Sequence, residues 1–190
     1  MRLHLGKNIG FHMGDDRARV ESTRDVTDVG AIIRPATEAD LPSVGRLGAL
    51  LVGAHHELDP KRFIAATRQT EHGYASFLQT QLAQPNVVLL VAEHDGRVIG
   101  YSYAGVEGYD WMALRGPAAV LHDLVVDPAQ RSHGVGGMLL DATLAALTER
   151  GAPRVVLWTA ERNEAAQRLF ARAGFRRTMI EMTREISSDK

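Results

Sequence analysis

Apolar residues recur along this chain with two different periods, one typical of helices and the other typical of strands. Between residues 41 and 51, leucines and a valine return every three or four positions, as on the buried face of an amphipathic helix. Thr37 and Asp40 precede this stretch at the spacing of an N-cap and an imperfect capping box. A second helical region is expected over residues 59–82, opened by an Asp-Pro pair and interrupted near Gly73.

Short apolar runs between turn residues predict the strands. Pro35 ends the first run, and Asp95-Gly96 is a strong hairpin signal between the second and third runs. The expected strands cover residues 31–34, 87–92, 98–106, 118–126, 154–159 and 176–185.

Two more helices are expected toward the end of the chain, over residues 135–150 and 164–173. Asn163 is the expected N-cap of the last helix, and Gly151 and Gly174 stand just after the two helix ends. Antiparallel hairpins followed by a crossover helix imply an α/β (α+β) fold with a mixed, mostly antiparallel sheet flanked by helices.

The first 29 residues differ from the rest, because they carry many charges and no apolar core of signal-peptide length. We therefore expect residues 1–29 to be a flexible leader or extension, and residues 30–190 to form a single domain. A net charge of −1 gives no electrostatic support for a nucleic-acid partner. No run of 18 apolar residues occurs, so no transmembrane helix is expected.

The chain contains no cysteine, which excludes disulfides, thiolate metal sites and a cysteine nucleophile. This is compatible with the reducing cytoplasm, where we expect the protein. His55-His56 could suggest a metal site, but adjacent histidines cannot easily aim at one ion, so we expect no metal. A mobile loop on the substrate side is the preferred interpretation of this stretch.

The most informative segment is the turn between the strand that ends at Val126 and the helix that follows it. It reads Arg131-Ser132-His133-Gly134-Val135-Gly136-Gly137, with Arg-x-x-Gly-x-Gly at its centre. Glycines let a backbone approach a ligand closely, and successive N–H groups at a helix start bind anions. An arginine adds charge-assisted contacts to phosphate. The segment therefore predicts a cradle for a pyrophosphate.

Three segments together resemble the GCN5-related N-acetyltransferase (GNAT) family. Arg131, Gly134 and Gly136 match the family's acyl-CoA-binding loop, Gln/Arg-x-x-Gly-x-Gly/Ala. Residues 163–175 resemble its Asn-x-x-Ala-x-x-Leu-Tyr-x-x-x-Gly-Phe segment, and residues 33–40 resemble its first strand and helix entry. The resemblance extends over residues 31–182 and implies a fold in which two central strands splay apart to admit a pantetheine arm.

The resemblance implies an N-acetyltransferase that moves an acetyl group from acetyl-CoA directly to a primary amine of a small molecule or peptide. The splayed strands would be those of residues 118–126 and 154–159. Backbone groups would hold most of the cosubstrate. The residues implied in acetyl-CoA binding are Leu124, Val125, Val126, Arg131, Ser132, His133, Gly134, Val135, Gly136, Gly137, Asn163 and Phe170.

His122 is the candidate catalytic base, because imidazole has a near-neutral intrinsic pKa suited to removing a proton. Successive side chains of a strand point to opposite faces. Counting back from Val126 therefore places His122 on the face expected to meet the substrate, and Asp123 would face the other way unless a bulge shifts the register. The alternative is a polar pair that only satisfies nearby backbone or faces solvent.

Phe170 departs from the family pattern, which places a tyrosine there as the usual acid for the leaving group. Tyr101, Tyr103, Tyr109 or water could protonate the thiolate instead. The departure keeps open a second function, a catalytically silent acyl-CoA-binding module or sensor. The chain lacks Gly-x-Gly-x-x-Gly and Gly-Lys-Ser/Thr, which disfavours a dinucleotide-binding domain and a P-loop ATPase.

The sequence does not identify the acceptor amine. The loop of residues 108–117 is rich in turn residues and is expected to form a lid, with Trp111 and Arg115 beside Arg68 on the acceptor side. Only one strand is expected after Phe175, which would leave a sheet edge for a homodimer.

Overall fold

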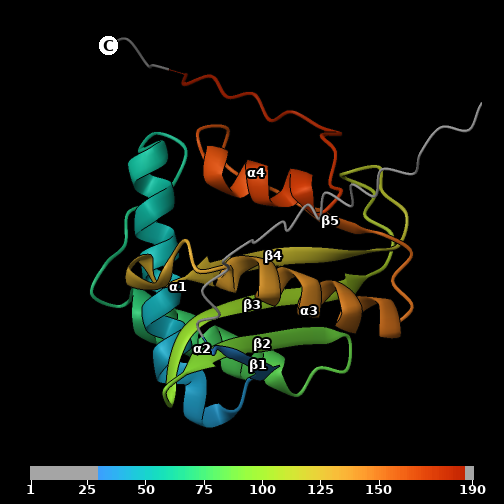
Figure 1. Cartoon of the computed structure of the whole chain (residues 1–190). Coiled ribbons are helices and arrows are strands. Elements are labelled where there is room, and N and C mark those ends of the chain that lie inside the picture. The colour runs from blue at the N-terminus through green and yellow to red at the C-terminus, as the bar shows by residue number, and fades with distance from the viewer. Residues whose placement is uncertain (1–29, 187–190) are drawn as a thin grey trace, which may run out of the picture.

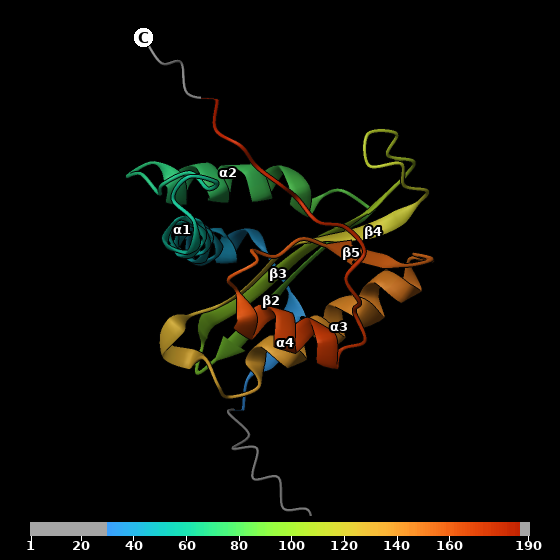
Figure 2. The same cartoon turned by 90° about the horizontal axis from the view of Figure 1, so that it is seen from above.

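The computed structural model describes residues 30–186, and it contains a five-stranded sheet between two helical layers (Figure 1). Helices α1 and α2 cover one face of the sheet, and α3 and α4 cover the other (Figure 2). No helix in this part of the chain is long and apolar enough to cross a bilayer. The elements are β1 (Ile32–Pro35), α1 (Leu41–Leu58), α2 (Thr70–Leu82), β2 (Val87–His94), β3 (Arg97–Glu107), β4 (Ala118–Val126), α3 (Val135–Glu149), β5 (Val155–Leu157) and α4 (Glu164–Arg172).

The strands lie in sequence order, and only the last pair is parallel. The turn between β2 and β3 has positive φ at Asp95 (49°) and Gly96 (70°), as a two-residue hairpin of the predicted kind requires. The crossover helix α3 connects the parallel pair β4 and β5. The predicted mixed, mostly antiparallel sheet is therefore confirmed.

The pairing of β4 with β5 stops well before β4 ends. It runs only from Ala119–Val155 to Leu121–Leu157, whereas β4 continues to Val126. Past this point β4 keeps β3 as its neighbour on one side and has no β5 partner on the other. The two strands thus separate toward the N-terminal end of α3.

A β-bulge at His122 reverses the faces of β4. Tyr103 pairs with Asp123 and Ala104 pairs with Leu121, so His122 is an extra residue without a partner opposite. Leu121 packs in the core under α3, whereas Val125 packs in the core under α1. An unbroken strand would keep positions 121, 123 and 125 on one face, so the bulge transfers Asp123 and Val125 to the side of α1 and α2.

The two layers have separate cores. The core between the sheet and α1 and α2 centres on Val44, Leu47, Leu78, Val91 and Tyr101, all fully buried. The core under α3 and α4 is built by small and aliphatic residues of the strands, by α3 and by the end of α4; its buried members include Val88, Ala104, Ala119, Leu121, Val135, Leu139, Leu140 and Leu147.

Two glycines allow α1 and α2 to pack closely. A Cβ at Gly45 would overlap the carbonyl oxygen of Glu71, and a Cβ at Gly48 would overlap the ring of Tyr74. Gly53, one turn and a half further along α1, faces open space. The close approach of the two helices therefore depends on Gly45 and Gly48, and it places Tyr74 beside the sheet.

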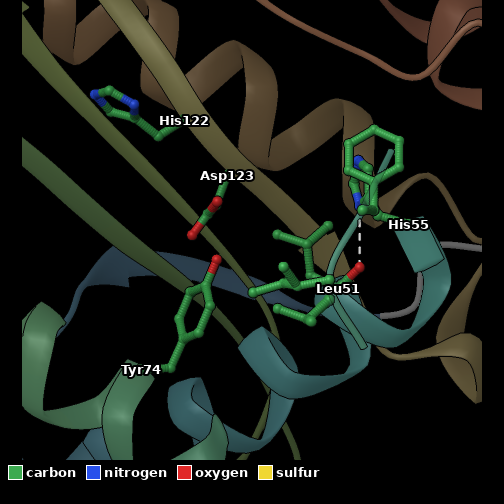
Figure 3. Close-up of a pocket in the computed structure, with 8 residues that line it drawn as sticks. Leu51, His55, Tyr74, His122 and Asp123 are labelled. Atoms are coloured by element: carbon green, nitrogen blue, oxygen red, sulfur yellow. Dashed lines mark hydrogen bonds between the residues drawn. The ribbon is translucent and has the colours of Figure 1, made fainter. Parts of the chain in front are cut away.

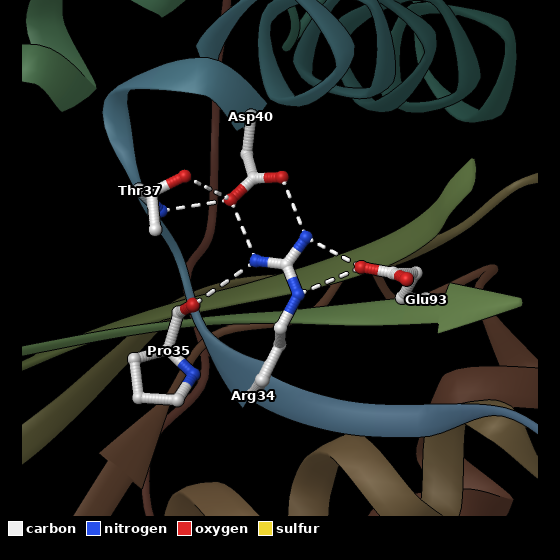
Figure 4. A network of polar contacts seen from close by, with 5 residues as sticks. All are labelled: Arg34, Pro35, Thr37, Asp40 and Glu93. Carbon is white, nitrogen blue, oxygen red and sulfur yellow. Dashed lines mark hydrogen bonds and ion pairs between the residues drawn. The ribbon is translucent and has the colours of Figure 1, made fainter. Parts of the chain in front are cut away.

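An ion-pair network fastens β1 to the start of α1 and to β2 (Figure 4). Arg34 donates to both oxygens of Asp40 at 2.7 and 2.8 Å, and its Nε donates to Glu93 at 2.8 Å. Asp40 also accepts from the backbone N–H and the hydroxyl of Thr37, which completes the predicted capping box. These contacts lower the pKa of Asp40 to about 2, with the hydrogen bond from Arg34 as the largest cause.

Three predicted boundaries are wrong. Pro35 belongs to β1, which an edge strand tolerates because the proline's missing N–H lies outside the ladder. No helix opens at Asp59: its carboxylate instead accepts the N–H groups of Lys61 and Arg62, which forms a turn. The helix begins only at Thr70 and passes through Gly73 without interruption.

The strand expected over residues 176–185 is also wrong. Residues 175–186 form no strand, and Met179, Ile180 and Met182 are exposed. Apolar residues in this segment suggested a strand, but no neighbour pairs with it in the described part of the chain. The predicted leader, residues 1–29, lies outside the described residues, as do residues 187–190.

We expect Gly48→Ala to lower the free energy of unfolding by about 1–3 kcal/mol, because the added methyl group overlaps the Tyr74 ring. Urea unfolding followed by circular dichroism measures this. Gly53→Ala is the matched control in the same helix, and it should gain up to about 1 kcal/mol from helix propensity. Equal effects of the two substitutions would show that the close contact between α1 and α2 is absent.

We expect Asp40→Asn to cost about 2 kcal/mol at pH 7, because the lowered pKa of Asp40 stabilises the folded state. A depressed carboxyl pKa contributes fully above the unfolded value near 3.8 and is lost as pH falls toward about 2. Urea titrations should therefore show the difference from wild type shrinking between pH 4 and pH 2. Glu38→Gln, which removes an exposed charge from the same turn, controls for net charge.

Candidate active site

A pocket of about 210 Å³ lies between β4 and the ends of α1 and α2 (Figure 3). One side is formed by His122 and Asp123 of β4. The remaining wall is mostly apolar and comes from α1, from the loop before α2 and from α2 itself. Its residues are Leu51, Val52, His55, Phe63, Ile64 and Tyr74.

Asp123 is the buried acid of this pocket. The hydroxyl of Tyr101 donates to its Oδ2 at 2.9 Å, and the hydroxyl of Tyr74 points at the same carboxyl group (Figure 3). Burial raises the pKa of Asp123, while hydrogen bonding and the nearby histidines His122 and His55 oppose that rise only in part. Burial beside Asp123 also raises the pKa of both tyrosines, so they stay protonated as donors.

His122 lies at the rim of the pocket and is held from two sides. Its ring stacks on Tyr103 with a centroid distance of 4.9 Å, and its Nε2 lies 3.2 Å from Oε1 of Glu107. Arg115 donates to the other oxygen of Glu107 at 2.8 Å. An ionised carboxylate can only accept a hydrogen bond, so Nε2 of His122 carries the hydrogen that points to Glu107. Nδ1 is then the ring nitrogen that does not contact Glu107.

His55 is anchored in a similar way on the opposite wall. Its Nδ1 lies 2.9 Å from the carbonyl oxygen of Leu51, and its ring packs edge-on against Phe63. The neighbouring His56 contacts the carbonyl oxygen of Phe63 through Nδ1 at 2.8 Å. Both histidines lie in α1, so the mobile loop expected for this stretch is wrong, and their contacts hold the loop between α1 and α2 against the pocket.

The bulge corrects the predicted orientation of Asp123. Alternation from Val126 placed His122 and Asp123 on opposite faces, but both line the same pocket beside α1 and α2. Tyr103, on which His122 stacks, also belongs to the core on that side. A bulge is invisible in the alternation of residue types here, because residues 118–121 are apolar on both faces.

The predicted phosphate loop presents backbone N–H groups at the N-terminal end of α3. Gly134 is the N-cap with φ 81°, and Ser132 also has a positive φ of 70°. The first bond of the helix runs from Met138 N to Gly134 O at 3.1 Å. In the described part of the chain, the N–H groups from Ser132 to Gly137 find no acceptor, which fits an anion such as a pyrophosphate.

The side chains of this loop differ in what they can contact. Val135 is buried in the core, so only its N–H group is available. Arg131 is exposed and donates through Nε to the carbonyl oxygen of Val126 at 3.3 Å. His133 is exposed, with Nδ1 3.4 Å from the carbonyl oxygen of Gln130. A Cβ at Gly137 would meet nothing within 4 Å, so the backbone there is open to a ligand.

Leu124, Val125 and Val126 form the part of β4 that β5 leaves uncovered. Leu124 and Val126 turn their side chains toward α3, and Val125 turns toward α1. Asn163 caps α4 as predicted, since its side-chain oxygen accepts the N–H of Ala166 at 3.2 Å. These segments border the gap that opens where β4 and β5 part.

Phe170 packs into the core between α4 and the sheet. Its ring lies 5.8 Å from that of Phe175, in an edge-to-face arrangement. The alternative tyrosines have other partners: Tyr101 donates to Asp123, Tyr103 to Gln81, and Tyr109 stacks on Trp111. The fold therefore brings no tyrosine hydroxyl to the position of Phe170.

The comparison with known families agrees with this arrangement. The model of the acetyltransferase (GNAT) family matches residues 54–175, which is more than half of the chain. The protein belongs to the GNAT family of acetyltransferases.

Relatives and solved structures support the same assignment. An uncharacterized N-acetyltransferase of Mycobacterium tuberculosis H37Rv is 33% identical over 97 residues, which cover 50% of this chain and 56% of that protein. The chain thus matches little more than half the length of this relative. A GCN5-related N-acetyltransferase from Ralstonia eutropha JMP134 superposes with a TM-score of 0.63 at 26% identity, covering 83% of this chain and 99% of the other.

A further structure has the same fold and contains a ligand. A predicted acetyltransferase from Clostridium acetobutylicum, solved with acetyl-CoA, has a TM-score of 0.60 at 15% identity. The alignment covers 80% of this chain and 96% of the other. At this identity the likeness concerns the fold alone.

We expect Asp123→Asn to raise the free energy of unfolding at pH 7, because a buried carboxyl with a raised pKa destabilises the fold when it ionises. The sign is opposite to that of Asp40: the penalty is absent below the unfolded pKa near 3.8, grows as pH rises above it, and is complete once pH passes the raised folded value. Urea unfolding at pH 4 and pH 7 measures the difference. A loss of stability at pH 7 equal to that of Asp40→Asn would contradict this electrostatic description.

Proposed function

We propose that this protein is an acetyl-CoA-dependent N-acetyltransferase that transfers the acetyl group directly to a primary amine of a small molecule or peptide. The observation that carries the proposal is the separation of β4 from β5 after Leu121, with free N–H groups at the start of α3. The bulge beside this separation directs His122 and Asp123 into the pocket on the α1 and α2 side. A cosubstrate site and an acceptor site thus meet at β4.

The amides of Ser132 to Gly137 would hold the pyrophosphate of the cosubstrate, with Arg131 and His133 beside it. The backbone groups of Leu124 and Val126, on the edge of β4 that β5 leaves uncovered, would bind the pantetheine arm as an added strand does, with Val125 between them. Asn163 and Phe170 would border the arm from α4. When bound, acetyl-CoA supplies an activated acyl thioester.

The acceptor enters as an ammonium ion and must lose a proton before it can attack. Asp123, in its ionised form, would attract the ammonium group into the pocket, and the ammonium charge would in turn favour that form. His122, whose Nδ1 is free because Glu107 engages Nε2, would take the proton directly or through water. A backbone N–H near Val126 would polarise the thioester carbonyl. With Phe170 in place of a tyrosine, water would protonate the departing thiolate.

Several observations support small acceptors in a soluble compartment. The pocket is small, the net charge is −1, and the absence of cysteine is compatible with the cytoplasm. The net charge of −1 gives no support for a basic surface that could bind a nucleic acid. Homodimerisation remains a prediction. It was based on a strand expected over residues 176–185, and these residues form no strand.

Thiol release from acetyl-CoA with a panel of primary amines tests the proposal. We expect turnover by wild type and a fall in kcat of about 100-fold in His122→Ala, as for loss of a general base. His72→Ala, an exposed histidine on α2 outside the pocket, should keep the wild-type rate. An unchanged rate in a folded His122→Ala variant would remove His122 from catalysis.

Calorimetric titration with CoA separates an enzyme from a sensor. Wild type should bind CoA, and Gly134→Ala should bind more weakly because alanine is strained at φ 81°. CoA binding without thiol release from any amine would overturn the proposed reaction and favour an acyl-CoA-binding sensor. Absence of CoA binding would overturn both functions.

A further inference from the structure

We infer that the acceptor is a primary amine on an uncharged, apolar carbon skeleton, and that α-amino acids are excluded. The inference rests on the proposed function and concerns the chemistry of the pocket beside His122 and Asp123. It follows from three properties of that pocket: which polar atoms it offers, which charges line it, and what covers its walls.

The polar atoms that the pocket offers are hydrogen-bond acceptors. Asp123 presents a carboxylate, already held by Tyr101 at 2.9 Å. His55 uses Nδ1 as a donor to the carbonyl of Leu51, so Nε2 of the neutral ring is an acceptor. His122 uses Nε2 toward Glu107, so Nδ1 of the neutral ring is an acceptor as well. Three acceptors suit an ammonium group, which has three N–H donors and no acceptor.

In the part of the chain that the structure describes, the pocket offers no permanent cation, that is, no arginine or lysine, for an acidic acceptor. Among the described residues that line it, none is an arginine or a lysine. The nearby Arg62 lies over the Phe63 ring at 4.9 Å from its centroid, and its guanidinium is paired with Glu181. Arg115 is paired with Glu107, behind His122. A carboxylate next to the reacting amine would therefore lie beside the acid Asp123 with no arginine or lysine among the described pocket residues as its partner.

The remaining walls favour an apolar skeleton of limited size. Leu51, Val52, Phe63 and Ile64 supply aliphatic and aromatic surface, and Tyr74 turns its hydroxyl toward Asp123. A volume of about 210 Å³ equals that of about seven water molecules in the liquid. Ile64 is largely exposed, so it lies at the mouth of the pocket. A short alkyl or arylalkyl group fits these walls better than a polyhydroxylated or polycationic one.

Matched acceptor pairs test this inference. The full chain is assayed for thiol release from acetyl-CoA with 2-phenylethylamine against phenylalanine, and with 3-methylbutylamine against leucine. Each pair differs only by the carboxylate. We expect kcat/KM to be at least about tenfold higher for the amine of each pair, since an unpaired buried charge costs more than one factor of ten. Spermidine and an aminoglycoside are included as polar, polycationic amines.

A charge added at the mouth of the pocket provides an internal control. Ile64→Arg adds a cation at an exposed loop position, and we expect it to raise the relative use of phenylalanine over 2-phenylethylamine. Ile64→Gln, of similar length without charge, removes the same apolar group, so only the added charge separates the two variants, and Ile64→Arg should use phenylalanine more than Ile64→Gln does. The two variants need no change in the buried core, so both should fold.

The possible results separate this inference from the proposed function. Turnover of phenylalanine or leucine equal to or above that of the matched amine overturns the inference and leaves the acetyltransferase intact. Preference for spermidine or the aminoglycoside over both apolar amines also overturns it. No thiol release with any acceptor overturns the proposed function itself.

Discussion

The arrangement of this protein depends on one extra residue in β4. At His122 the antiparallel ladder with β3 accommodates two residues opposite one, and the strand changes the face that each later residue presents. On the side of β5, pairing ends at Leu121, one residue before the bulge. The bulge therefore lies where the two strands separate, and it directs two polar side chains into the pocket.

Other contacts hold this irregularity in place. Tyr103 stacks on His122, Glu107 and Arg115 fix its outer nitrogen, and Tyr101 holds Asp123 from the adjacent strand. The close contact of α1 and α2 brings the Tyr74 hydroxyl to the same carboxyl group. A buried acid with a raised pKa is unfavourable for folding, and such groups are common at functional sites. The two aspartates Asp40 and Asp123 illustrate the contrast: the first is paired with an arginine and stabilises the fold, and the second is buried with no arginine or lysine among the described residues of its pocket.

Much of this fold was predictable because the signals were local. The hairpin at Asp95-Gly96, the Asn163 cap, the glycine after α3 and the β4 boundaries all follow from short-range rules. The phosphate loop was also predictable, since its glycines and its position before a helix define it. The residues that face the pocket were harder to predict. Regular alternation placed Asp123 on the other face, and the sequence could not decide whether a bulge reverses this, because a bulge leaves no mark in an apolar strand.

Contacts between distant segments account for the other errors. Gly45 and Gly48 look like helix-weakening residues in the sequence, yet they allow α2 to approach. The segment of residues 176–185 has the composition of a strand without a partner in the described chain. In each case the deciding information was a neighbour far away in sequence.

Amide chemical shifts measured with and without CoA test the central claim most directly. We expect CoA to shift the amide resonances of residues 132–137 and of Leu124 to Val126 most strongly, because these residues would bind the pyrophosphate and the pantetheine arm. Residues of the β2–β3 hairpin should be unaffected. Strong shifts elsewhere, with the resonances of residues 132–137 unchanged, would contradict the account.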